Sequence, residues 1–330
     1  MSPTVTWLMA VRDGMPFLRE TLAAIAAQQF DHPHALLVWD NGSSDGTVDE
    51  LRRWIPGRIP GQIVVGHPLT IGAAAARLVE LAPSELCARI DADDLPEPGR
   101  LRRQVEFLHR HPEVAAVGTQ VTAINQHGLP ISVQREPYYL DHDDILHQLL
   151  YRCALRQPSV MLRKSAVLAV GNYADIQPTE DYDLFLRLAT RFKLANMPER
   201  LLRYRYHERS ISQHLPDFLH YHREVRSGIF ARQAPVLYGL DESTASRLSR
   251  RELHCAATAL IRIVRHLERS HRRGFRTRLG SQSFRASAEK LIRPTDRLAH
   301  WLLRFGSRTA TAPSADACEA PDTDSVIVGP

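Results

Sequence analysis

The sequence predicts an α/β fold, with a doubly wound, mostly parallel sheet flanked by helices and a helical region after it. Two observations predict this class. Between Thr4 and Asp91, strand-like apolar segments alternate with segments whose apolar residues recur at helical spacing. Three of the strand-like segments lead directly into polar clusters, as is typical of ligand sites beyond parallel strands. The 330 residues suit a domain of about 200 residues plus an addition.

The first strand is predicted over Thr4–Val11, where apolar residues alternate, and a helical stripe runs from Leu18 to Ile25. The near-continuous apolar run 35–40 is typical of a parallel strand that is covered on both faces. Thr47 and Glu50 have the spacing of a capping box, which predicts the start of the next helix. The remaining expected elements are a strand over Gln62–Gly66, a helix over Gly72–Leu81 and a strand over Leu86–Asp91.

An acidic cluster follows the last of these strands. On an extended chain, Asp91 and Asp93 would face one side and Asp94 the other, and Pro96 and Pro98 would end the strand. Two adjacent like charges are unfavourable unless a cation lies between them. Carboxylates are ligands of Mg²⁺ and Mn²⁺, so the pattern predicts a divalent metal site. The alternative is a solvated acidic turn.

Three polar clusters stand at strand ends that we expect to lie on one edge of the sheet: Val11–Asp13, Asp40–Ser43 and Asp91–Asp93. The sequence has no G-x-G-x-x-G after the first strand and no G-x-x-x-x-G-K-[ST], which argues against a dinucleotide fingerprint and a P-loop.

The composition narrows the class further. No apolar run approaches the roughly 18 residues of a membrane span, and Arg12 and Asp13 interrupt the first apolar segment too early for a secretory signal. The cysteines are far apart and lack C-x-x-C spacing, which favours a reducing, cytoplasmic compartment over a cysteine-based zinc site. They are Cys87, Cys153, Cys255 and Cys318.

A second acidic cluster begins where Pro178 and Thr179 mark the start of a helix. Asp181 shares the apolar stripe of this helix and should line a cleft or have a partner. Asp183 is interpreted as an ordinary surface pair with Arg187, four residues on. The alternative is that these acids only decorate the helix start, where the helix dipole favours them.

Taken together, these segments resemble the successive signatures of family 2 glycosyltransferases. The resemblance covers residues 4–213 and implies an inverting, metal-dependent enzyme of the GT-A fold that uses nucleotide sugars. The motifs that carry it are Val11–Leu18, Val38–Thr47, Ala88–Asp94, Arg100–Gly118, Gln157–Lys164, Thr179–Leu184 and Tyr204–Ser212.

The resemblance assigns roles to individual residues. Asp181 matches the general base, and Asp93, with Asp91 nearby, matches the ligands of Mg²⁺ or Mn²⁺. His207 follows an alternating strand, Leu201–Tyr206, and is interpreted either as a metal or phosphate contact or as a structural residue. The residues expected to bind the donor are Val11, Arg12, Asp13, Asp40, Asn41, Arg77 and Asp91.

The chain also departs from the family pattern. Arg12 stands where relatives usually carry an aromatic residue, and a guanidinium stacks on a nucleobase less predictably. Asn41 replaces a frequent second Asp, which leaves Asp40 as the match to the residue that reads the base. Arg77 matches a frequent arginine, whereas Leu78 replaces the usual Asn.

The composition changes near Pro216, which predicts a catalytic domain over 1–215, a basic helical region over 216–306 and a disordered tail over 307–330. The helical region is interpreted either as packing on the catalytic domain or as a peripheral contact with anionic lipid on the cytoplasmic face of a membrane.

The predicted activity is transfer of a sugar from a nucleotide-diphosphate sugar, UDP-linked, to a saccharide or lipid-linked acceptor hydroxyl. This activity suits the assembly of cell-surface polysaccharide or glycolipid. The alternatives are a sugar nucleotidyltransferase, against which the missing Gly-rich, basic opening loop argues, and a non-catalytic basic binding protein. The pI of 9.2 permits a nucleic-acid partner, but the chain has no recognised binding module, and we predict none.

Overall fold

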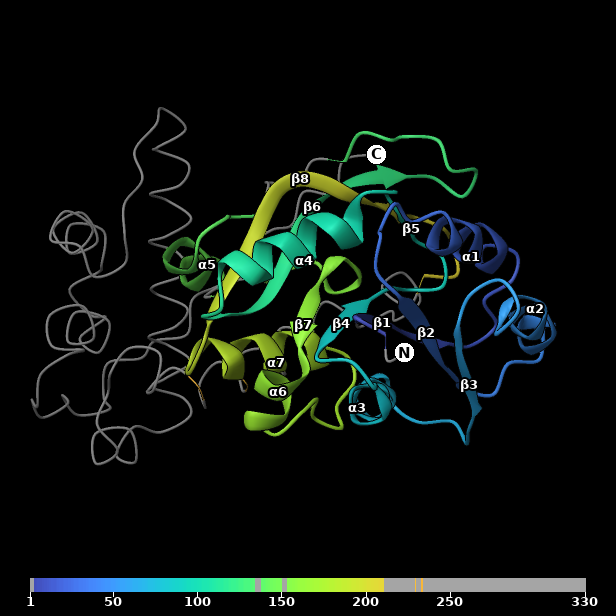
Figure 1. Ribbon diagram of the computed structural model, residues 1–330, viewed down its shortest axis with the longest axis horizontal. Coiled ribbons are helices and arrows are strands. Elements are labelled where there is room, and N and C mark those ends of the chain that lie inside the picture. Colours follow the sequence, from blue (N-terminus) through green and yellow to red (C-terminus); the bar gives the residue numbers. More distant parts are fainter. Residues whose placement is uncertain (1–2, 134–137, 150–152, 211–228, 230–232, 234–330) are drawn as a thin grey trace, which may run out of the picture. The chain divides into compact units, whose positions relative to one another are not determined.

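The computed structural model of the protein describes residues 3–133, 138–149, 153–210, 229 and 233 (Figure 1). The chain divides into two units, Met1–Ile229 and Phe230–Pro330, and the description below concerns the first. Apart from Ile229 and Gln233, the region predicted from 216 onward lies outside the described residues, so the domain boundaries stay predictions. Among the described helices, none has both the length and the apolar character needed to cross a bilayer.

The described part of the chain forms one sheet of eight strands in the order β3-β2-β1-β4-β7-β6-β8-β5 (Figure 1). The first four of this order are parallel, β4–β7, β7–β6 and β8–β5 are antiparallel, and β6–β8 is parallel. The predicted α/β sheet is confirmed, with an antiparallel part that the strand–helix alternation did not predict. The strands are β1 (Val5–Val11), β2 (His34–Asp40), β3 (Gly61–Val65), β4 (Leu86–Arg89), β5 (Leu95–Pro96), β6 (Val114–Ile124), β7 (Met161–Arg163) and β8 (Lys193–Arg205).

Helices cover both faces of the sheet. Apolar residues of α1, α2 and α4 share one buried cluster with Val5, Trp7 and Met9 of β1. Because side chains alternate along a strand, Leu8 belongs to the opposite face, and α3 packs there against β1 and β2 and also contacts α7. The helices are α1 (Leu18–Ala26), α2 (Thr47–Trp54), α3 (Ile71–Leu81), α4 (Arg100–Arg110), α5 (His142–Leu149), α6 (Lys164–Ala169) and α7 (Glu180–Ala189), with a 3-10 turn over Gln157–Ser159.

The strand order places a topological switch beside β1. The chain steps from β1 to β2 to β3 in one direction and then returns to β4 on the other side of β1. In sheets of this kind ligands bind in the crevice outside the carboxyl ends of the strands at the switch. The register pairs Val11 with Asp40, so β1 and β2 end level with each other. The predicted convergence of polar strand ends therefore follows from the topology.

The acidic segment after β4 is a turn and not the extended chain that the sequence predicted. Strand β4 ends at Arg89, and the backbone N–H of Asp94 donates to the carbonyl oxygen of Asp91 at 3.4 Å. Pro96, which was expected to end the strand, instead lies in a strand of the same sheet. Leu95 and Pro96 form β5 and pair with β8 at the end of the strand order. An edge strand tolerates a proline because one side of it needs no ladder hydrogen bond.

The predicted capping box of α2 is wrong. The N-cap residue of the helix is Gly46 at φ 89°, which has no side chain to cap the helix itself. Asp45 takes the capping role, because its Oδ1 accepts from both the backbone N–H (3.0 Å) and the hydroxyl (2.6 Å) of Thr47. The Thr47 oxygen in turn accepts from the N–H of Gly14 at 2.8 Å, and Glu50 bonds to side chains further along the helix instead.

Helix α3 lies in close contact with the segment that leads to α7. A Cβ added at Gly72 would stand 2.0 Å from the carbonyl oxygen of Ala174, so only glycine allows this approach.

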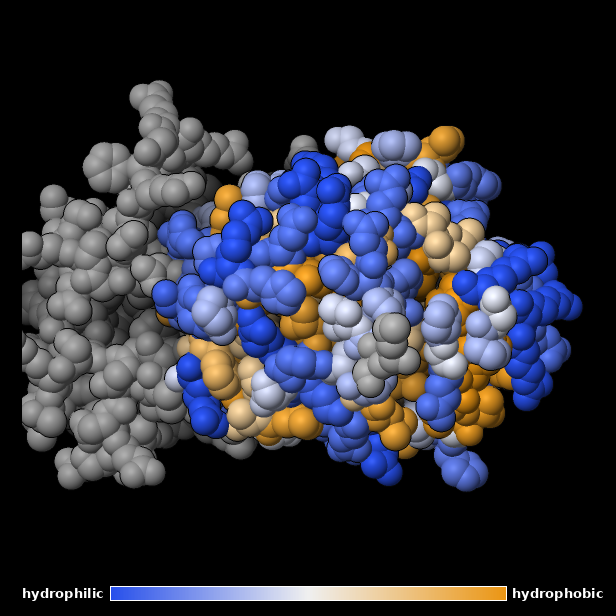
Figure 2. Space-filling model, viewed as in Figure 1, coloured by the Kyte–Doolittle hydropathy of each residue, from blue (hydrophilic) through white to orange (hydrophobic). Residues whose placement is uncertain are grey.

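Hydrophilic side chains gather over α2 and α4 in Figure 2, and both helices expose arginines. The exposed arginines of these two helices are Arg52, Arg53, Arg102, Arg103 and Arg110.

Candidate active site at the strand ends

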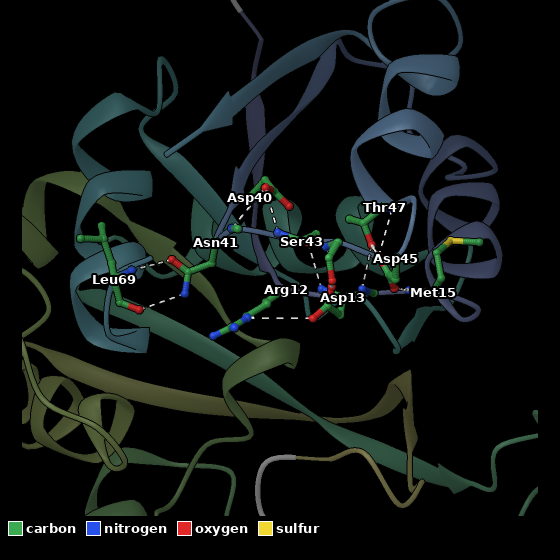
Figure 3. Close-up of polar contacts among 12 residues, drawn as sticks. Arg12, Asp13, Met15, Asp40, Asn41, Ser43, Asp45, Thr47 and Leu69 are labelled. Carbon is green, nitrogen blue, oxygen red and sulfur yellow. Dashed lines mark hydrogen bonds and ion pairs between the residues drawn. The ribbon is translucent and has the colours of Figure 1, made fainter. Parts of the chain in front are cut away.

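The loops that follow β1 and β2 are tied together by side chains. The N–H of Asp13 donates to Ser43 Oγ at 2.9 Å, and Asp13 Oδ1 accepts from the N–H of Ser44 at 2.7 Å (Figure 3). The N–H of Met15 donates to Asp45 Oδ2 at 2.8 Å. Asp13 has φ 51°, a left-handed conformation that Asp adopts more readily than most residues. Asp13 therefore stabilises the loop after β1 by joining it to the loop after β2.

Asp40 and Asn41 occupy the end of β2. The Asn41 amide donates to the carbonyl of Leu69 at 2.9 Å and accepts from its N–H at 2.7 Å, which ties in the segment after β3 (Figure 3). Asp40 is buried, and its Oδ2 accepts from the N–H groups of Gly42 and Ser43 at 3.2 and 3.3 Å. Asp40 Oδ1 is buried without a hydrogen-bond partner in the described part of the chain. Buried polar atoms usually have hydrogen-bond partners, so this oxygen is suited to accept a hydrogen bond from a ligand.

The two arginines expected to bind the donor lie in different places. Arg12 follows Val11 at the end of β1, its side chain is 64% exposed, and its Nε lies 4.0 Å from Asp13 Oδ2. In Figure 3 it points toward the side where Asn41 and Leu69 lie. Arg77 is exposed on α3 and pairs with Glu80 at 2.9 Å, about 9 Å along the helix from its start at 1.5 Å per residue. These contacts do not bring Arg77 to the strand-end cluster.

The predicted metal ligands have basic partners. His207 Nε2 lies 2.7 Å from Asp93 Oδ2, and Arg89 Nη2 donates to Asp91 Oδ1 at 3.2 Å. The pKa of Asp91 is raised to about 6, chiefly because the surrounding protein desolvates it; Arg89 opposes this rise, and the nearby charges of Asp93 and Asp181 contribute to it. His207 therefore contacts Asp93, Asp91 lies near enough for its pKa to respond to the Asp93 charge, and their role as metal ligands stays a prediction.

Asp181 faces the same cluster from the first turn of α7. It is half-buried, its Oδ1 accepts from the N–H of Tyr182 at 2.7 Å, and the Cys153 thiol lies 3.5 Å from its Oδ2. Its charge is close enough to raise the pKa of Asp91. The carboxylate at the start of α7 therefore acts on Asp91 in the strand-end turn through its charge.

The first turn of α7 buries other acids than the predicted Asp181. Its neighbours Glu180 and Asp183 are the buried acids. Asp183 does pair with Arg187, with a 2.8 Å bond to Nε, but Asp183 is buried and Arg187 partly buried, so this is not the surface pair that the spacing suggested. Burial, and then the adjacent Asp181 charge, raise the pKa of Glu180 to about 8.

Thr179 precedes the helix at φ 89°, a conformation that a β-branched residue rarely adopts. Its hydroxyl is buried without a partner among the described residues. Strain of this kind persists where the surrounding structure imposes it, and it occurs most often at functional sites.

Sequence reasoning missed the buried cations behind the acids. Arg89, Arg100 and Arg205 are fully or almost fully buried. Arg100 donates from Nη2 to the carbonyl of Arg89 at 2.7 Å and stacks over Trp7 at 5.0 Å, and burial lowers its pKa to about 9. The signal for Arg89 was a cation inside a short apolar strand, where an unpaired charge is unfavourable.

The acids suit a divalent cation that shares its coordination with a substrate. In the part of the chain described, no group of three or more His, Cys, Asp and Glu side chains could hold an ion alone. Mg²⁺ usually takes one or two carboxylates and completes its shell with water and phosphate oxygens. The carboxylates of Asp91 and Asp93 match that donor set; desolvation, and then the Asp93 charge, raise the pKa of Asp91.

Comparisons with known proteins agree with this architecture. Residues 6–169 match the model of glycosyl transferase family 2. The amylovoran biosynthesis glycosyltransferase AmsE of Erwinia amylovora is 28% identical over 57% of this chain and 70% of its own length. The O-antigen biosynthesis glycosyltransferase WbnJ of Escherichia coli is 25% identical over 62% and 81%. Residues 1–349 of S. aureus TarS, in complex with UDP-GlcNAc, share the fold with a TM-score of 0.57 at 12% identity, over 92% of this chain and 87% of that one.

The family match and the fold define a glycosyltransferase of the GT-A fold. The chain belongs to glycosyl transferase family 2. The resemblance noted in the sequence is thereby confirmed at the level of family and fold.

Glu180→Gln is expected to raise the midpoint of thermal unfolding much more near pH 9 than near pH 5. Because the pKa rises from 4.5 to about 8 on folding, the folded protein keeps a proton that the unfolded chain releases. Stability therefore falls as pH rises through this window, and Gln, which does not titrate, removes that loss. Calorimetric scans at both pH values measure the effect, at about 2–4 °C per kcal/mol.

The matched control is Glu113→Gln. The Glu113 carboxylate has a lowered pKa, mainly because its own backbone N–H donates to it, so this variant should gain nothing at high pH. An equal gain near pH 5 and pH 9 in Glu180→Gln would contradict the prediction.

Proposed function

We propose that the protein is an inverting glycosyltransferase that moves a sugar from a nucleotide-diphosphate sugar to an acceptor hydroxyl. The observation that carries the proposal is the meeting of two kinds of carboxylate at one sheet edge. Asp91 and Asp93 are held by basic partners. Asp181 is half-buried and lies near enough to Asp91 to influence its pKa.

On the donor side, the joined loops after β1 and β2 would hold the nucleotide, with Asp40 and Arg12 as the candidate contacts to the base. Asp91 and Asp93 would hold the divalent cation, with His207 beside Asp93 as a further ligand or a phosphate contact. A bound Mg²⁺ or Mn²⁺ neutralises charge on the departing nucleotide diphosphate. The loops would orient the diphosphate toward the turn.

On the acceptor side, Asp181 would act as the general base. It accepts the proton of the acceptor hydroxyl while that oxygen forms a bond to the anomeric carbon. The bond from the anomeric carbon to the phosphate oxygen breaks, and its electron pair leaves with the nucleotide diphosphate. A single displacement from the opposite side inverts the anomeric configuration and needs no covalent enzyme intermediate.

The names of the relatives suggest the donor and the product. AmsE and WbnJ are named for amylovoran and O-antigen biosynthesis, which supports a role in cell-surface polysaccharide or glycolipid assembly with a saccharide or lipid-linked acceptor. The TarS structure carries UDP-GlcNAc, so a UDP-linked donor is the first candidate for this chain.

The proposal is tested by incubating the full chain with a panel of UDP-, GDP- and dTDP-sugars, with Mn²⁺ or Mg²⁺ and after chelation. We expect metal-dependent release of free nucleotide diphosphate from one nucleotide class. Asp93→Ala should abolish this release and keep the fold, since removal of one carboxylate relieves repulsion in the metal-free protein.

The panel also separates the alternatives. Release that survives chelation, or that Asp93→Ala leaves intact, would remove the metal from the proposal. Pyrophosphate formed from a sugar phosphate and a nucleoside triphosphate would indicate a nucleotidyltransferase instead.

Asp181→Asn is expected to lower turnover by about 10²–10⁴ and to leave donor affinity nearly unchanged. Asn keeps the size and can hydrogen-bond the hydroxyl, but it cannot take the proton. The control is Asp49→Asn, which removes an exposed acid from the first turn of another helix, α2. Calorimetric donor binding alongside turnover measures both quantities, and near-normal turnover would move the search for the base to Glu180.

We further propose that residues 216–306 contact the cytoplasmic face of an anionic membrane. The support is compositional, because arginine and histidine are dense in this basic region. The full chain should then sediment with acidic vesicles and be released as salt rises. Equal binding to neutral vesicles, or no binding to either, would leave this region with a packing role.

A further inference from the structure

Arg205, the last residue of β8, joins four segments of the chain. Its side chain is fully buried. Its Nε donates to the carbonyl oxygen of Asp93 at 2.8 Å, and its Nη2 to Glu20 Oε2 in α1 at 2.7 Å. Its Nη1 donates to the carbonyl oxygen of Gln126, beyond the end of β6, at 3.0 Å, and its guanidinium lies over the ring of Phe17 at 4.8 Å.

The backbone of Arg205 holds the same turn a second time. Its N–H donates to Asp94 Oδ1 at 2.8 Å, and Asp94 is buried. Two residues further on, His207 contacts the Asp93 carboxylate and stacks against Phe17, with ring centroids 4.5 Å apart. The end of β8 therefore fixes the backbone and the carboxylates of the Asp93–Asp94 turn.

We propose that Arg205 is a positioning residue that holds the Asp93–Asp94 turn in the conformation that binds the metal and diphosphate. The inference rests on the proposed function for the identity of the ligand. It adds that metal affinity depends on a buried guanidinium that does not itself touch the metal or the substrate.

The geometry explains why this position needs arginine. A guanidinium carries five N–H donors in a planar fork, and the contacts to Asp93, Glu20 and Gln126 leave it in three directions. A lysine ammonium keeps the charge but donates from a single point, so it cannot bridge the same groups. Loss of the bridge would free the carbonyl of Asp93, which belongs to the same residue as the carboxylate expected to bind the metal.

The test compares Arg205→Lys, Arg205→Met and Glu20→Gln with Arg163→Met in the full chain. Arg163 is the matched control, because its guanidinium also donates to backbone carbonyls, those of Val114 and Leu108, at 2.9 and 2.7 Å. Those carbonyls lie at the end of α4 and the start of β6 and not at the acidic turn. Unfolding midpoints identify any variant that does not fold, and Glu20→Gln, altered at a carboxylate that is 56% exposed, serves as the mild variant.

Two readouts are used. The first is hydrogen exchange of a peptide over Ile90–Pro96 in the metal-free protein, which Arg205→Lys should accelerate and Arg163→Met should not. The second is Mn²⁺ affinity in the presence of UDP, by calorimetry. Arg205→Lys should weaken it by about 10–100-fold, as loss of an outer-shell partner does, and Glu20→Gln by about two- to fivefold, as loss of an exposed ion pair does.

Each result decides the inference. Unchanged exchange at Ile90–Pro96 in Arg205→Lys, or an equal loss of Mn²⁺ affinity in Arg163→Met, would overturn it. If wild-type protein binds no Mn²⁺ with UDP, GDP or dTDP while Arg205→Lys still accelerates exchange, the proposed function fails and the hold on the turn stands. Faster exchange with normal Mn²⁺ affinity would overturn the role in metal binding.

Discussion

Concentrated negative charge at one edge of the sheet is the constraint that organises this protein. Asp91, Asp93 and Asp94 stand in one turn, and the charge of Asp181 in α7 acts on Asp91. Asp94 is buried, and the side chains of Asp91 and Asp93 are 38% and 29% exposed, so charges this close together need hydrogen-bond donors or nearby cations. Desolvation still raises the pKa of both Asp91 and Asp94, which shows that the protein's own cations compensate the charge only in part. A divalent cation would complete this compensation, and binding one therefore suits the site.

Much of the fold could be predicted from the sequence because it depends on local patterns. The apolar runs of β1 and β2 and the helical stripe of α1 are read from neighbouring residues, and the structure confirms them. Strand β5 was missed because Leu95–Pro96 is too short to show a pattern, and only its pairing with β8 makes it a strand. The α2 capping box failed because Thr47 bonds to Gly14, a contact between distant loops that sequence spacing cannot reveal.

The candidate site could likewise be predicted from the sequence only in part. Asp91, Asp93 and Asp181 could be identified because acids that follow an apolar strand or open an amphipathic helix stand out locally. Their buried basic partners could not. Arg205 lies 112 positions from Asp93 in the chain, and His207, 114 positions away, was named only through the resemblance to a family. Hydrophobic periodicity also treats arginine as a surface residue. A buried arginine can therefore be noticed in the sequence only where it interrupts an apolar strand. Around Asp181, the αL residue Thr179 sets the start of α7, which is why Glu180 and Asp183, and not Asp181, point inward.

The two halves of the site are supported by different parts of the fold, and this separation has a consequence for the chemistry. The turn that carries Asp91 and Asp93 is held by Arg89 of β4 and by the end of β8, whereas Asp181 stands in the first turn of α7. The halves influence each other through charge, since Asp181 raises the pKa of Asp91. A cation bound at the turn would replace this repulsion with attraction and favour the ionised form of Asp181. Donor and metal would then leave Asp181 ready to accept a proton at the moment when an acceptor hydroxyl enters.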